Sequence, residues 1–380
     1  MQKKKKIVFI NQATGYLTID IINEFAKDYD EVALIAGSIR VQDIPLDPKV
    51  KWSKITKYDR GNPKKKFLSW LIGTIQIFFL LLFRYRRYEI FYITIPPSAY
   101  LLSLVLPNKF SVLVFDVYPD VLEIYNIKKT SLIYRSWSRW NRKLFRKAHR
   151  VFTIGEGMAR LLDAYMARDK MKIIPLWSGL TKIKPVAKAD NPWLRDLGLQ
   201  NKFIVQYSGN IGYTHNVEVM VDLAREFVGN PDIHFLIIGR GERVNHIKQI
   251  IEDHELKNTS LLPFQPDDVL NYSLAAADLG VVILDEKSAH VSLPSKIYNL
   301  QAVAVPMLGI STLDSELNGH LELFENGKCF VASDIQGMVG YINNLSNDKA
   351  AIQALSENSK KASVNFTIAN AKKYYEEYVS

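Results

Sequence analysis

Residues 292–306 place a cation and small polar residues at the start of an expected helix, directly after a buried apolar strand. The helix is expected to begin at Pro294, Ser295 and Lys296. Amides at a helix start attract negative charge, and Lys296 adds a mobile cation in the first turn. Two interpretations are open. Either Lys296 is a solvated first-turn lysine, or it binds a nucleotide diphosphate together with nearby amides, including that of Leu293.

Three more segments of the second half carry groups that suit a nucleotide. A glycine-rich stretch, residues 207–216, offers backbone amides to phosphate, and its assigned residues are Ser208, Gly209 and Asn210. After the next expected strand, Gly239 lets the main chain approach a flat ring and Arg240 can reach phosphate. Phe264 follows a further strand and would stack on a base, although phenylalanine is more often core. Their recurrence at successive strand ends predicts a nucleotide site.

Polar residues also follow the expected strands of the first half. Asp116 is assigned as a catalytic carboxylate that acts as a general base or positions the acceptor, with pairing to an arginine as the alternative. Gly15 either approaches the donor or only shapes a turn. The residues assigned to an acceptor are Tyr16, Asp120 and Glu156. Helix capping by Asp120, and a dipole contact of Glu156 in a first helical turn, are the structural alternatives.

For these residues to form a site, strands and helices must bring them to one edge of a sheet. Short apolar runs alternate with helical patterns throughout, which predicts parallel sheets covered by helices on both faces. The runs are residues 7–11, 32–36, 50–55, 90–95, 111–115, 151–154 and 172–176 in the first half, and 203–208, 234–238, 260–262, 279–284 and 304–308 in the second. The predicted class is α/β, with two Rossmann-like doubly wound domains facing a central cleft. We expect the first domain over residues 1–183 and the second over 184–363.

Composition narrows the classes of function. The chain has 380 residues and one cysteine, which excludes a disulfide framework and a cysteine metal site and fits a reducing cytosol. No export segment is expected after the lysines at positions 3–6. The net charge of +10 divides into +17 for residues 1–183 and −7 for the remainder. A basic first half predicts an anionic partner for that half, either phospholipid or nucleic acid.

An uncharged apolar run, Phe67 to Phe83, lies between basic clusters. It is shorter than the ~20 residues that span a bilayer and holds several polar residues, so we do not expect a transmembrane helix. It is either a buried helix on the first sheet or a helix whose outer face docks onto anionic lipid. A basic aromatic segment, residues 135–143, supports lipid contact. The residues assigned to the membrane are Trp70, Phe78, Arg84, Trp137 and Trp140.

Nearly the whole chain resembles glycosyltransferase family 4. The resemblance is carried by Asp116-Val-Tyr-Pro-Asp, residues 151–158, residues 172–177, Tyr207-Ser-Gly-Asn-Ile-Gly, Gly239-Arg-Gly-Glu and, most specifically, Pro294-Ser-Lys-x-Tyr. It is closest to bacterial members that build surface polysaccharides on lipid carriers. The sequence departs from the wider family at Val291 and Asn299, where that family has two glutamates. Asn299 is therefore assigned to the nucleotide ribose as a neutral hydrogen-bonding group.

The resemblance implies the GT-B fold and a retaining transfer of a hexose or N-acetylhexosamine. The donor is a nucleotide sugar, with UDP expected, and the acceptor is a lipid-linked saccharide of O-antigen, capsule or exopolysaccharide synthesis. The resemblance implies no cofactor and no obligatory metal. Lys296 and Arg240 would stabilise the departing diphosphate. Residues 364–380 resemble the last helix of the family, which returns to the first domain. The protein is expected in the cytoplasm, peripheral on the inner face of the cell membrane.

Three other classes of function stay open. A GT-B sugar-nucleotide epimerase would need cleft acids around one nucleotide and no lipid-facing surface. A basic membrane-binding or nucleic-acid-binding protein without catalysis would use the basic aromatic segments, but the acidic second half argues against nucleic acid. An NAD-linked enzyme is disfavoured because no G-x-G-x-x-G fingerprint follows the first strand.

Overall fold

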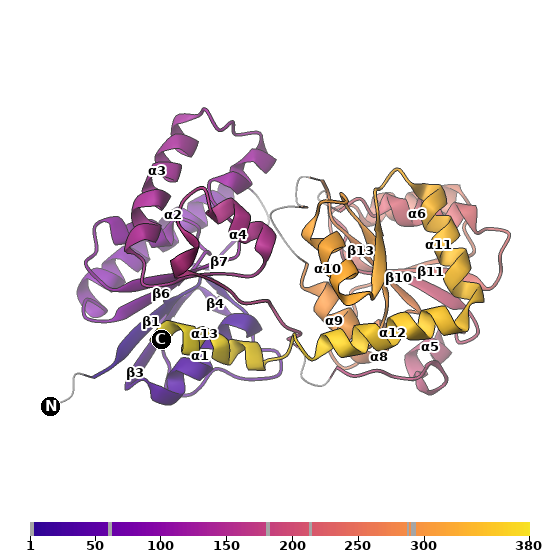
Figure 1. Cartoon of the computed structure of the whole chain (residues 1–380), viewed down its shortest axis with the longest axis horizontal. Coiled ribbons are helices and arrows are strands. Elements are labelled where there is room, and N and C mark those ends of the chain that lie inside the picture. The colour runs from indigo at the N-terminus through magenta and orange to yellow at the C-terminus, as the bar shows by residue number, and fades with distance from the viewer. Residues whose placement is uncertain (1–3, 60–62, 180–182, 213–214, 287–288, 290–293) are drawn as a thin grey trace. The chain divides into compact units, whose positions relative to one another are not determined.

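A computed structural model describes residues 4–59, 63–179, 183–212, 215–286, 289 and 294–380. The chain forms two compact units, Met1–Gly179 with Ile368–Ser380, and Leu180–Thr367 (Figure 1). The expected domain boundaries, 183/184 and 363/364, each lie about four residues from the boundaries of these units. Each unit is built around a parallel sheet, so the predicted α/β class is confirmed.

The first unit contains a seven-stranded parallel sheet in the order β5-β3-β1-β6-β7-β8-β9. Its strands are β1 (Lys6–Ile10), β3 (Glu31–Ala36), β5 (Lys51–Lys54), β6 (Glu89–Ile93), β7 (Phe110–Val114), β8 (Val151–Thr153) and β9 (Met171–Ile173). A separate pair joins β2 (Ala13–Thr14) to β4 (Ser38–Ile39). The central strands are apolar at nearly every position because helices cover both faces of a parallel sheet.

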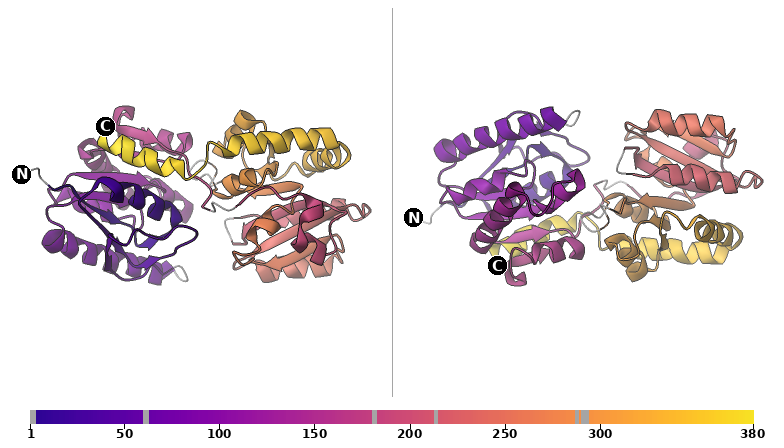
Figure 2. Two further views of the ribbon diagram at one scale, coloured as in Figure 1. Left: turned by 90° about the horizontal axis from the view of Figure 1, so that it is seen from below. Right: turned by 90° about the horizontal axis from the view of Figure 1, so that it is seen from above.

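The helices of the first unit include the last helix of the chain. They are α1 (Tyr16–Asp28), α2 (Pro63–Phe79), the π-helix η1 (Leu80–Arg84), α3 (Leu132–Lys147), α4 (Glu156–Leu162) and α13 (Ala369–Val379), with 3₁₀ turns η2 (Ala99–Leu104), η3 (Asp120–Tyr125) and η4 (Arg168–Lys170). Helix α13 lies beside α1 (Figures 1 and 2). It is held by the Tyr378 ring, 5.1 Å from that of Phe25, and by the Tyr378 hydroxyl, which donates to Glu89 at 2.7 Å.

Helix α2 and its π-helical extension lie largely on the surface. Only 22% of the most apolar 18-residue stretch within Lys64–Arg84 is buried inside the protein. This exposure contradicts the interpretation of a buried helix on the sheet. The exposed apolar residues are Phe67, Leu68, Leu71, Ile72, Ile75, Phe79, Leu82 and Phe83. The helical segment has 21 residues and a mean hydropathy of 1.9, so by length and composition alone it is long enough to cross a membrane. The expectation that this segment is too short to span a bilayer is therefore wrong, because the helix extends beyond the uncharged run.

The second unit contains a six-stranded parallel sheet in the order β12-β11-β10-β13-β14-β15. Its strands are β10 (Phe203–Asn210), β11 (Ile233–Arg240), β12 (Thr259–Pro263), β13 (Leu279–Ile283), β14 (Met307–Ile310) and β15 (Gly327–Phe330). The sequence did not predict β15. It is a four-residue edge strand that begins with Gly327 and exposes Lys328, so its apolar signal is confined to Cys329 and Phe330.

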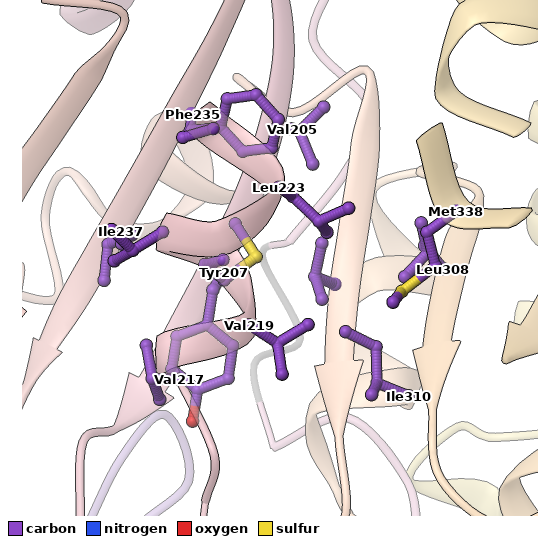
Figure 3. Packing of buried hydrophobic residues seen from close by; sticks show 14 of the residues in the cluster. Val205, Tyr207, Val217, Val219, Leu223, Phe235, Ile237, Leu308, Ile310 and Met338 are labelled. Carbon is purple, nitrogen blue, oxygen red and sulfur yellow. The ribbon is translucent and has the colours of Figure 1, made fainter. Parts of the chain in front are cut away.

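Helices pack on both faces of this second sheet. They are α5 (Pro192–Asp196), α6 (Glu218–Glu226), α7 (Val244–Asp253), α8 (Leu270–Leu274), α9 (Lys296–Ala302), α10 (Glu316–Phe324), α11 (Ile335–Asn347) and α12 (Lys349–Ser363), with the 3₁₀ turn η5 (Lys188–Asp190). The core on one face joins strand residues such as Val205 and Ile237 to Leu223 of α6 and Met338 of α11 (Figure 3). Tyr207 lies in this core, at the end of the sheet where the strands finish (Figure 3).

Candidate active site

The carboxyl ends of β10, β11 and β12 lie side by side in the second unit. Gly209 pairs in register with Gly239, and Gly239 with Pro263, so the segments that follow these strands start at one edge. A Cβ atom on Gly239 would lie 2.1 Å from the carbonyl oxygen of Gly209, closer than any real contact. Gly241 has φ +153°, and a Cβ there would lie 2.2 Å from the Ile211 carbonyl oxygen. Glycine is therefore required for the main chains to approach at this edge.

Lys296 lies at the same edge, at the start of α9. Its ammonium nitrogen lies 4.1 Å from the centroid of the Tyr207 ring, and a Cβ atom on Gly209 would lie 2.8 Å from it. This nitrogen is fully buried and makes no hydrogen bond to any residue that the structure describes. Burial lowers the pKa of Lys296 from its ordinary value to about 7. The site therefore holds a buried cation with no anion beside it in the described part of the chain.

His215 lies near Lys296 and Asp285 lies near His215, and neither was predicted as a site residue. Burial lowers the pKa of His215, the charge of Lys296 lowers it further, and the charge of Asp285 opposes both effects. Asp285 also lines a cavity of about 210 Å³ at the ends of β13, β14 and β15. The hydroxyl oxygens of Ser311 and Thr312, on its wall, are buried without a hydrogen-bond partner among the described residues. Asp285 follows a buried strand directly, which is the sequence signal that could have identified it.

Arg240 and Phe264 form a cation–π pair beyond the ends of β11 and β12. The Arg240 guanidinium carbon lies 4.8 Å from the centroid of the Phe264 ring, and both side chains are exposed. The two side chains are adjacent to one another. The contact of Arg240 with phosphate and the contact of Phe264 with a base stay predictions. A guanidinium in a cation–π contact still has N–H groups available to a ligand.

The remaining donor assignments fall at the same edge or outside the described residues. Ser208 is half-buried, and the backbone oxygen of Asn210 accepts a hydrogen bond of 2.7 Å from the Tyr207 hydroxyl. Ser295 precedes α9 without making a side-chain cap, Pro294 comes before it, and Asn299 is half-buried within the helix. Leu293 and Val291 lie outside the described residues.

In the first unit, Asp116 follows β7 by two residues. Burial raises the pKa of its carboxyl group, and the positive charge of Lys66 opposes that rise. The main chain before α1 places Gly15 at the N-cap, where an added Cβ would meet no atom within 4 Å. The Tyr16 hydroxyl donates to the Trp177 carbonyl oxygen at 3.1 Å, and burial is the main cause that raises its pKa to about 12.

The other two acceptor assignments have partners within the first unit. The carboxylate of Asp120 accepts hydrogen bonds from the hydroxyls of Tyr134 at 2.7 Å and Tyr165 at 2.6 Å. Glu156 is exposed and forms an ion pair of 2.9 Å with Arg168. These contacts join η3 and α4 to neighbouring segments, so each carboxylate has a structural role whether or not it contacts an acceptor.

The residues assigned to a membrane separate into two groups. Trp70 faces an aromatic cluster, with its ring stacked 6.0 Å from Tyr58 and edge-on to Tyr118 at 6.4 Å. Trp137 stacks on Tyr118 at 5.4 Å and donates to the Tyr100 hydroxyl at 2.8 Å. Arg84 and Trp140 are exposed, whereas Phe78 is half-buried, as Trp70 and Trp137 are. Trp140 of α3 is 42% exposed.

No group of three or more His, Cys, Asp or Glu side chains within the described ranges is arranged to hold a metal ion. Lys296, Arg240 and the glycine-bounded strand ends can hold an anion with a flat ring attached. A nucleotide diphosphate has that chemistry.

Known proteins that are similar to this chain include glycosyltransferases. Residues 191–362 match the family model of glycosyl transferases group 1. The chain is 27% identical over 322 residues to a probable glycosyltransferase, WbjE, of Pseudomonas aeruginosa, covering 80% of this chain and 79% of that protein. It is 29% identical to a putative colanic acid biosynthesis glycosyl transferase, WcaI, of Escherichia coli K12, covering 50% of this chain and 48% of that protein.

Among solved structures, the chain is similar to Anabaena HepE, crystallised with UDP and glucose. The TM-score is 0.72 with 16% sequence identity, over 99% of both chains. This likeness confirms the predicted GT-B fold, with its two Rossmann-like domains.

Proposed function

We propose that the chain, a glycosyltransferase with the GT-B fold, transfers a sugar, with retention, from a UDP-sugar to a lipid-linked saccharide in bacterial surface polysaccharide synthesis. The single observation that carries the proposal is the buried ammonium of Lys296, which has no hydrogen-bond partner among the described residues. Burial of an unpaired charge is unfavourable, so the site becomes satisfied when an anion binds. The likeness to proteins named for colanic acid synthesis and for UDP binding supports the substrate class.

In the proposed reaction, the bond between the sugar C1 and the donor phosphate oxygen breaks, and a bond from an acceptor hydroxyl oxygen to C1 forms. The acceptor proton passes to the departing diphosphate. Lys296 and Arg240 stabilise the charge that grows on that diphosphate, which is the largest electrostatic change of the reaction. Asp116 positions the acceptor hydroxyl as it loses its proton.

The donor assignment predicts a nucleotide-dependent rise in stability. We expect UDP at 100 times its dissociation constant to add about 2.7 kcal/mol to the free energy of unfolding, because it binds only the folded state. A thermal-shift series with UDP, GDP and their sugar derivatives measures this and selects the base. Lys248→Ala, on the exposed face of α7, is the control that should keep the shift. If no nucleotide or nucleotide sugar shifts the melting temperature, the donor proposal is wrong.

We further propose that the exposed face of α2 and η1 binds the inner leaflet, which brings the enzyme to a lipid-linked acceptor. Phe79 is 51% and Phe83 is 76% exposed, and their rings stack 6.2 Å apart. Each phenylalanine that enters an apolar layer contributes about 1.5–3 kcal/mol. Basic residues at both ends of the segment add about 1 kcal/mol each near an anionic surface. The docking surface is therefore apolar in its middle and positive at its ends.

This surface predicts binding to vesicles that contain phosphatidylglycerol. We expect the double variant Phe79→Glu, Phe83→Glu to reduce co-sedimentation with such vesicles at least ~10-fold, because two apolar anchors become charges. The matched control changes two exposed apolar residues of the second unit, Leu323→Glu and Val364→Glu, and should bind as the wild type does. Wild-type protein that stays in the supernatant with anionic vesicles at low salt would rule out this surface.

A further inference from the structure

An aromatic ring lies beside the buried ammonium of Lys296, where a carboxylate would usually pair with a buried cation. The ammonium nitrogen is 4.1 Å from the centroid of the Tyr207 ring, which is within the range of a cation–π contact. Tyr207 is fully buried, and its ring packs among Val217, Val219 and other core side chains (Figure 3). The ring is therefore a rigid surface, built into the core of the second unit.

The far end of the Tyr207 side chain is also held in place. Its hydroxyl donates to the Asn210 carbonyl oxygen at 2.7 Å. Burial raises the pKa of this hydroxyl well above its ordinary value, so it stays neutral and cannot act as a counter-ion for Lys296. What faces the ammonium is the ring, whose electron-rich face attracts a cation.

Gly209 closes the other side of this small space. A Cβ atom there would lie 2.8 Å from the Lys296 ammonium and 3.4 Å from the Tyr207 hydroxyl oxygen. The ammonium is thus confined between the ring and the main chain at the end of β10. A carboxylate in place of the ring would neutralise the lysine and repel a diphosphate. An aromatic ring attracts the charge but accepts no strong hydrogen bond, so the N–H groups stay available to an anion.

We infer that Tyr207 is a positioning residue of the donor site, whose ring holds the Lys296 ammonium at the end of β10 where the donor diphosphate binds. The inference rests on the proposed function. A lysine side chain has many rotamers, and confining it before the ligand arrives reduces the entropy lost on binding. Tyr207 thus acts on the diphosphate through Lys296 and needs no contact with it.

Substitutions at position 207 separate the electronic role of the ring from its packing role. Tyr207→Phe keeps the ring and removes the hydroxyl, and we expect UDP affinity to fall less than ~3-fold. Replacement of Tyr207 by 3,4,5-trifluorophenylalanine keeps the shape of phenylalanine but withdraws electrons from the ring face. We expect this protein to bind UDP about 10-fold more weakly than the Tyr207→Phe variant, measured by isothermal titration calorimetry. Tyr207→Leu should lose at least as much affinity.

Phe235 provides the control for packing. It is a fully buried ring of the same core, on β11, and the cation–π contact recorded for Lys296 is with Tyr207. Trifluorophenylalanine at position 235 should leave UDP affinity unchanged. If Tyr207→Leu fails to fold, Gly209→Ala tests the same point, because its added methyl group displaces the ammonium without opening the core; we again expect about 10-fold weaker binding.

The outcomes separate the inference from the function on which it rests. A trifluorinated protein at position 207 that binds UDP as tightly as Tyr207→Phe overturns the positioning role, while the donor site stands. An equal loss from fluorination at position 235 also overturns it, because the effect would then be one of general packing. A wild-type protein that binds neither UDP nor GDP overturns the proposed function and this inference together.

Discussion

Lys296→Met is expected to reduce turnover by at least ~100-fold, the loss that follows when one preorganised contact to a developing negative charge is removed. The ammonium lies at the end of β10 with no hydrogen-bond partner among the described residues, so a diphosphate that binds there receives its full charge. Methionine fills nearly the same volume, so the variant loses the charge with little loss of packing. Initial rates with a nucleotide sugar and a lipid-linked acceptor measure the effect.

The same substitution is expected to make the protein more stable at low pH. Lys296 has a pKa of about 7 in the folded state, below its ordinary value of 10.5, so folding disfavours its charged form. At pH 6 the side chain is charged in both states and the folded state bears the whole penalty. We expect Lys296→Met to raise the free energy of unfolding by up to about 5 kcal/mol at pH 6, the equivalent of a pKa lowered from 10.5 to about 7. As pH rises from 7 towards 10.5, the folded wild type releases its proton and the difference shrinks.

Denaturant unfolding at pH 6, 7.5 and 9 checks this stability difference and its direction. Lys248→Ala removes a lysine from the exposed face of α7 and should leave both turnover and its pH dependence unchanged. A Lys296→Met protein with wild-type turnover would show that the lysine does not stabilise the leaving group. Equal stabilities at pH 6 would show that the ammonium is hydrated in the folded protein. The two results together test whether this buried charge lowers stability while it serves catalysis.

The strands could be predicted because buried parallel strands have few polar residues. All seven strands of the first sheet fall on predicted runs, as do five of the six in the second. The edge strand β15 was not predicted because only Cys329 and Phe330 of its four residues are buried. The exposure of α2 was not predicted because its sequence contains too many apolar residues rather than too few. Its residues are apolar around most of the helix, so hydrophobicity alone could not show which face meets protein and which meets solvent.

The candidate site was predictable where strand ends carry it. Gly209, Gly239 and Arg240 lie together because the carboxyl ends of neighbouring parallel strands share an edge. Contacts between distant segments left no such signal. The ring of Tyr207 is separated in sequence from Lys296 by nearly half of the second unit, and nothing in either local pattern links them. The two tyrosine hydroxyls that hold Asp120 likewise come from separate segments, so its carboxylate looked available in the sequence.

Asp116→Asn is expected to reduce turnover by about 100-fold, the loss that follows when one preorganised electrostatic contact is weakened. Asparagine keeps the shape and a hydrogen-bonding oxygen but lacks the negative charge that positions the acceptor hydroxyl while its proton passes to the departing diphosphate. Burial raises the pKa of the Asp116 carboxyl group, and the charge of Lys66 works against that rise. In the wild type we therefore expect activity to fall at acidic pH as the carboxylate takes up a proton, and this acidic limb should be absent from Asp116→Asn.

Lys66→Met tests whether Asp116 takes part in the reaction. It should shift the pH profile of activity in a known direction, and no such shift is expected if Asp116 is only structural. Without the cation, the pKa of Asp116 rises further, so the acidic limb of the plot of kcat against pH should move to higher pH. Activity on the alkaline side of this limb, where the carboxylate is ionised in both proteins, should change less than activity within the limb. Glu123→Gln, which removes an exposed carboxylate paired with Lys129, is the control and should leave the profile in place. If the acidic limb does not move in Lys66→Met, the titration belongs to another group and Asp116 has only a structural role.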